Sequence, residues 1–261
     1  MCRAFPLSHK DIMHVPTWVP VAGLPFVTGV GLLWLEAPAG SWFALTRAAL
    51  WRMAADALLV NVAIVVIAAP ILGVVVGARL AETGESRGRV WAIARRLGWL
   101  VSVFVGASAA VTTAGFGGTF PALALVATSH ATLGAAALAL ASMGALCRQQ
   151  LRDPLDAVAC STLLAGLVSF GVLLAGPLIQ DLPSVITNVA LLASPVVATA
   201  ASAQIDILRS ETFYQISSIA HRRFDYPAWD VATGVYLITT VLCFAFIHWF
   251  PRRLPNSPRQ G

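Results

Sequence analysis

Long apolar runs alternate along the chain with short polar segments. Each run is free of Asp, Glu, Lys and Arg, and each reaches the ~20 residues that a helix needs to cross a bilayer. The runs cover residues 12–35, 57–78, 97–147, 157–180, 182–205 and 231–251. Apolar and polar positions do not alternate within them, and lipid admits only helices or closed barrels as spanning structures. The pattern therefore predicts membrane-spanning helices.

The third run, residues 97–147, is too long for a single crossing and must fold back on itself. Residues 115–121, with three glycines and a proline, supply the turn, because these residues break a helix and favour turn geometry. The run then forms the third and fourth spans. The predicted fold is an all-α polytopic membrane bundle, a single domain over residues 1–261, with six transmembrane helices.

Basic residues predict the orientation, because cytoplasmic loops carry an excess of Lys and Arg. If residues 182–205 do not cross, twelve of the 17 basic residues share one side, and if they do cross, a different set of twelve does so. Both alternatives place the N-terminus in the cytoplasm, and the rule leaves six and seven spans open. We expect six, with residues 182–205 as a re-entrant or peripheral segment before the last span and both termini cytoplasmic.

Composition supports a membrane protein and argues against other classes. The chain is 58% hydrophobic and only 11% charged, whereas soluble domains carry about a quarter charged residues. The net charge of +5 comes from arginines clustered between the apolar runs. This pattern fits loops against the anionic cytoplasmic leaflet better than nucleic-acid binding. We therefore expect a lipid membrane as a partner and no nucleic acid.

Few side chains in the runs suggest chemistry. His130 and His248 lie near opposite faces of the predicted bundle, whereas a bis-histidine haem needs two histidines at one depth. The four cysteines form no CxxC pair, and the chain contains no GxxxxGK[ST], HExxH or GxSxG motif. We expect no cofactor, no metal site and no enzymatic activity in this chain.

Small and hydroxyl residues are frequent in the spans. Gly73 and Gly77 are four residues apart in the second span, as are Gly106 and Ala110 in the third, which also carries Ser108. Small residues allow helices to approach closely. Helix packing is the expected role, and a subunit interface or a weakly polar substrate path is the alternative.

Two regions resemble the ABC type-2 permease family, the membrane subunits of ABC exporters. After the second span, Glu85, Gly88 and the apolar residues 90–94 fit the family's glutamate, glycine and apolar helix, although residues 95–98 replace a proline that is common there. Farther on, the spans that end in residues 141–148 and 173–177 are similar to the family's small-residue span and its span ending in Gly-Pro. Residues 191–197 resemble its Leu-x-Asn-Pro stretch, with Ser194 in place of Asn.

The resemblance implies a function and a set of partners. Two permease subunits, identical or different, would work with a separate ABC ATPase subunit in the plasma (cytoplasmic) membrane. In the family, the loop after the second span forms a coupling helix that docks on the ATPase. Here that role would fall to Glu82, Glu85, Arg87, Gly88 and Trp91. A quinone- or haem-binding membrane anchor of a respiratory complex is the alternative, and a structural membrane protein is a third possibility.

Overall fold

The computed structural model describes residues 47–82, 89–116, 120–151, 153–174, 183–209 and 226–250. These residues are helical and contain no strand, which confirms the predicted all-α membrane bundle. The elements are α2 (Arg47–Glu82), α3 (Arg89–Phe116), α4 (Phe120–Gln150), α5 (Pro154–Leu174), α7 (Ser184–Ala193), α8 (Pro195–Ser202), the short 3₁₀ helix η1 (Ile207–Arg209) and α10 (Trp229–Trp249). The predicted first span, residues 12–35, lies outside the described residues.

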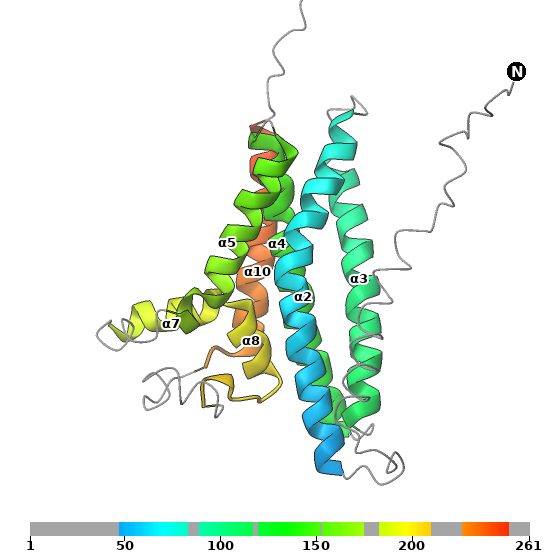
Figure 1. The fold of residues 1–261 in the computed structure, drawn as a ribbon, viewed down its shortest axis with the longest axis vertical. Coiled ribbons are helices and arrows are strands. Elements are labelled where there is room, and N and C mark those ends of the chain that lie inside the picture. Colours follow the sequence, from blue (N-terminus) through cyan, green and yellow to red (C-terminus); the bar gives the residue numbers. More distant parts are fainter. Residues whose placement is uncertain are drawn as a thin grey trace, which may run out of the picture.

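Five of the described helices, α2, α3, α4, α5 and α10, are long and apolar enough to cross a membrane. The predicted break in residues 97–147 is confirmed, since α3 ends at Phe116 and α4 begins at Phe120. The long helices run along the same axis, and the chain reverses direction between successive ones (Figure 1). Helix α4 packs against α2, α3, α5, α8 and α10, so it forms the centre of the bundle.

Glycines set the distance between α2 and α4. A Cβ atom added at Gly73 would lie 1.9 Å from the carbonyl oxygen of Ala141, and one at Gly144 would lie 2.1 Å from that of Pro70. The two backbones are therefore in direct contact, which confirms the expected packing role of Gly73. Gly106 differs, because a Cβ there would meet no described atom within 4 Å.

Residues 183–209 form a bent pair of helices, α7 and α8, that meet at an angle of 84°. The break falls at Ser194, whose Oγ accepts a hydrogen bond from the Val197 backbone N–H and donates one to Ser169 O at 2.6 Å. Pro195 follows at the first helical position, where its missing N–H costs nothing. Ser194 thus ends one helix and caps the next.

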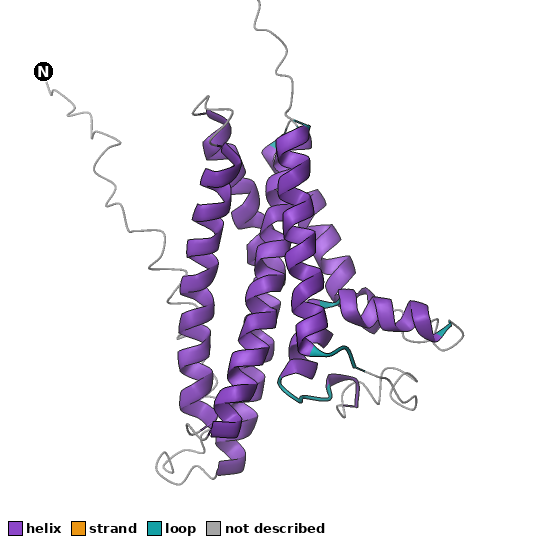
Figure 2. Cartoon of the chain, turned by 180° about the vertical axis from the view of Figure 1, so that it is seen from behind, coloured by secondary structure: helices purple, strands orange, loops and turns teal. Residues whose placement is uncertain are grey.

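The bent pair does not cross the bundle. Helices α4 and α10 run in the same direction, because Gln149 contacts Ile247 O at one end and Thr132 contacts Thr233 nearer the other. Helix α5 runs opposite to both, so the segment between α5 and α10 must return to the end at which it began (Figure 2). Nearly all of α8 is buried, whereas α7 exposes Val185 and Val189. The segment is the expected re-entrant or peripheral element.

Candidate functional site

The predicted coupling loop lies at the end of the bundle where α2 ends and α3 begins. Glu82 is the last residue of α2, while Glu85, Arg87 and Gly88 lie outside the described residues. Trp91, in the first turn of α3, is 71% exposed. An exposed indole beside a charged connection is available to a partner surface, which is the property that the prediction requires of Trp91.

Three exposed tryptophans mark this same end of the bundle. Trp91 and Trp99 lie on the first part of α3, and Trp249 ends α10. Figure 1 places the start of α3 and the end of α10 at the same end of the bundle, opposite the end of α3. Tryptophan is enriched at membrane–water interfaces, so this end coincides with an interfacial belt.

A buried chain of polar side chains connects α2, α3 and α4. Asn61 Nδ2 donates to Ser108 Oγ at 2.8 Å, and Ser108 Oγ lies 3.0 Å from His130 Nε2. His130 Nδ1 lies 2.8 Å from the carbonyl oxygen of Val126. All three side chains are almost fully buried. Burial of a polar group inside a span costs free energy unless the group is hydrogen-bonded, and Asn61, Ser108 and His130 are hydrogen-bonded here.

The geometry assigns the protons in this chain. A carbonyl oxygen only accepts, so the proton of His130 is on Nδ1 and is donated to Val126 O. In a neutral imidazole Nε2 is then the acceptor, and the Ser108 hydroxyl donates to it while accepting from Asn61. Both ring nitrogens of His130 are therefore engaged. The sequence pointed to His130 and Ser108, and Asn61 was recognisable as the only amide in the run 57–78.

A second set of hydroxyl groups joins α8 to the bundle. Thr132 Oγ1 lies 3.0 Å from Ser202 Oγ and 3.1 Å from Thr233 Oγ1. Thr128 Oγ1, one turn earlier on α4, donates to Ser202 O at 3.1 Å. These contacts hold the end of α8 between α4 and α10. The described residues contain no group of three or more His, Cys, Asp or Glu side chains with metal-binding geometry.

A comparison of the sequence with protein-family models and with curated proteins found no match.

Proposed function

We propose that this chain is the permease subunit of an ATP-driven transporter, which works with a separate ABC ATPase subunit and a second permease subunit. The placement of α7 and α8 carries the proposal. The bent pair comes directly before the last spanning helix in the chain, with α8 buried in the bundle and α7 projecting sideways from it (Figure 1). This is the arrangement that the resemblance to ABC type-2 permeases implies for residues 182–205.

We propose that the protein lies in the plasma membrane and that the end of the bundle with the α2–α3 connection faces the cytoplasm. The α2–α3 and α4–α5 connections and the end of α10 lie there (Figure 1). Arg95 and Arg96 on α3 and Arg148 on α4 belong to this end, and the sequence adds Arg87 and Arg252 beside it. An excess of basic residues is retained on the cytoplasmic side, so both termini are cytoplasmic in this proposal.

A permease of this kind converts a movement of the ATPase into a change of helix packing. The α2–α3 connection, with Glu82, Glu85 and Trp91, is the proposed contact with the ATPase. Helix α2 leads from it into the bundle and is locked to α4 through Gly73 and Gly144. A force on the connection would therefore move α2 and α4 together, because neither backbone has room to slide past the other.

Purification from native membranes tests the proposal. We expect the chain to retain an ATPase subunit with a phosphate-binding loop and a second permease subunit, and the complex to hydrolyse ATP. A complex that contains only redox subunits would contradict it and support the respiratory anchor. Both nitrogens of His130 are engaged, which argues against that residue as a haem ligand. A haem absorption band in the purified protein would overturn this argument as well.

A further inference from the structure

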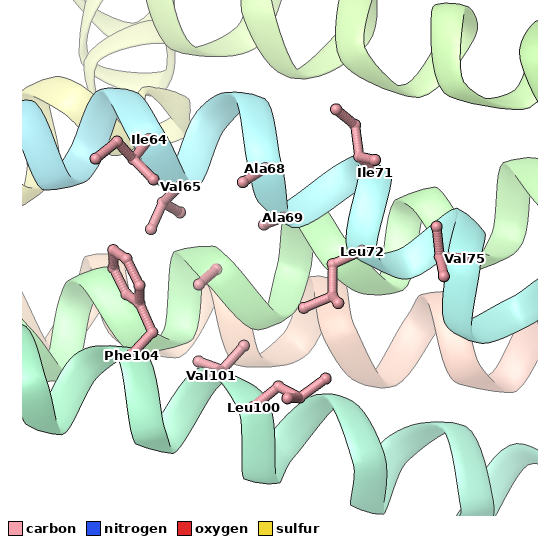
Figure 3. A pocket seen from close by; sticks show the side chains of 11 residues that line it. Ile64, Val65, Ala68, Ala69, Ile71, Leu72, Val75, Leu100, Val101 and Phe104 are labelled. Atoms are coloured by element: carbon pink, nitrogen blue, oxygen red, sulfur yellow. The ribbon is translucent and has the colours of Figure 1, made fainter. Parts of the chain in front are cut away.

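A groove lies between α2 and α3, and α4 forms its floor. It encloses about 300 Å³ and is lined by apolar side chains, among them Ile64, Ala68, Val75, Leu100, Phe104 and Ala137 (Figure 3). This volume is at the lower limit of small-molecule sites. Ala68 and Val75 are exposed at its rim, so the groove opens sideways from the described bundle.

The groove has the length and the surroundings of one membrane leaflet. Ile64 and Val75 are separated by roughly 16 Å along α2, at a rise of about 1.5 Å per residue. Half of a hydrocarbon core of about 30 Å is nearly the same length. Both helices are long and apolar enough to span the membrane at this depth, so the groove of the described bundle opens at the level of the acyl chains. The small side chains of Ala68 and Ala137 create the hollow.

The guanidinium group of Arg96 lies toward the end of the groove that is nearest the interfacial tryptophans. Arg96 precedes Leu100 by four residues, so the two share a face of α3, with Arg96 one turn nearer the end of the bundle. Arg96 is exposed, and the neighbouring Trp99 is 51% exposed. Arg95 lines the same hollow as Arg96 and Trp99, but it is turned roughly 140° around the helix from Leu100 and does not share the face of Leu100. A negative headgroup at Arg96 would place its acyl chain at Leu100, and from there into the groove.

We propose that the groove binds one acyl chain of an anionic phospholipid whose phosphate is held by Arg96. An ionised phosphate pairs with guanidinium through charge-assisted hydrogen bonds, and the apolar lining of the groove matches a hydrocarbon chain. The site requires no ATP and no partner subunit. The lipid site can therefore be disproved without contradicting the proposed transport function, and the transport function can be disproved without contradicting the lipid site.

Native mass spectrometry of the full chain tests the site, after delipidation and addition of phosphatidylglycerol or phosphatidylcholine with identical chains. We expect one phosphatidylglycerol to be retained about fivefold more tightly than phosphatidylcholine, the value of one arginine near an anionic headgroup. Arg96→Gln should abolish this preference, while Arg95→Gln, which removes the same charge from a position turned away from Leu100, should keep it. Equal behaviour of the two variants would overturn the assignment of Arg96.

Substitutions that fill the groove test whether an acyl chain occupies it. Ala68→Phe should weaken retention of both lipids roughly tenfold or more, because the chain loses its buried methylene contacts. Ala159→Phe adds the same ring to the exposed surface of α5 and should leave retention unchanged. Ala68→Leu is the smaller filling if the phenylalanine variant does not yield a monodisperse protein. Unchanged lipid retention in both Ala68 variants, or a photocrosslinker at Ala68 that captures residues 1–46 instead of lipid, would overturn the proposal.

Discussion

Gln149, at the end of α4, donates a hydrogen bond from Nε2 to the backbone oxygen of Phe250 at 2.9 Å, just beyond the end of α10. The last carbonyl groups of a helix have no partner within the helix, and here a side chain from a neighbouring span supplies one. The contact fixes the ends of α4 and α10 side by side. It thereby determines that the chain leaves its last span at the end of the bundle that holds the α2–α3 connection.

This arrangement predicts the location of the C-terminus. A reporter that is active only in the cytoplasm should be active when fused after Gly261, because an excess of basic residues at this end of the bundle favours the cytoplasmic side. The same reporter inserted after Gln204, in the turn that follows α8, should be inactive. Activity at Gln204 together with silence at Gly261 would reverse the proposed orientation.

The contact between α2 and α4 predicts a stability difference between glycines. Gly73→Ala and Gly144→Ala should each lower the free energy of unfolding by about 1–3 kcal/mol or more, because the new Cβ would meet a backbone oxygen of the other helix. Gly106→Ala is the matched control, since its Cβ would meet nothing described within 4 Å. Thermal unfolding in detergent measures the difference. Equal melting temperatures for all three variants would mean that the backbones of α2 and α4 are not in contact at Gly73 and Gly144.

The buried polar chain predicts a difference between two serines of α3. Ser108→Ala should destabilise the protein by about 1–2 kcal/mol, because Asn61 and His130 both lose the hydrogen bond to its hydroxyl. Ser102→Ala removes an exposed hydroxyl that contacts Gly98 O of its own helix and should cost little. Chemical unfolding of the two variants provides the measurement. If both substitutions lower the free energy of unfolding equally, the hydrogen bonds of Ser108 to Asn61 and His130 contribute no stability.

The proposed coupling loop predicts an effect on assembly. Glu85→Lys reverses a charge six residues before the exposed Trp91 in the sequence and should reduce the amount of ATPase subunit retained on purification several-fold, with insertion and abundance unchanged. Asp156→Lys is the control, because Asp156 is exposed at the start of α5 on the same end of the bundle. Wild-type retention and wild-type ATP hydrolysis in Glu85→Lys would remove this loop from the mechanism.

The sequence by itself determined which segments of the described chain are helices in a membrane. Transfer into lipid is favourable residue by residue, so an uninterrupted apolar run reports a span without knowledge of its neighbours. The turn between α3 and α4 was visible for a similar reason, since glycine and proline act on the local backbone. Gly73 was recognised as a packing residue, but nothing local identified Ala141 as the group it packs against.

Only the tertiary structure decided how residues 182–205 run. Counting basic residues gave the same result for six and for seven spans, because the two alternatives exchange equal numbers of arginines. The hydrogen bonds that Gln149 and Thr132 make to α10 resolve this, since they require α4 and α10 to run in the same direction. The link from Asn61 through Ser108 to His130 likewise depends on three helices meeting at one depth. Such pairings follow from the shape and contact of distant segments, and neither hydropathy nor charge along the chain records them.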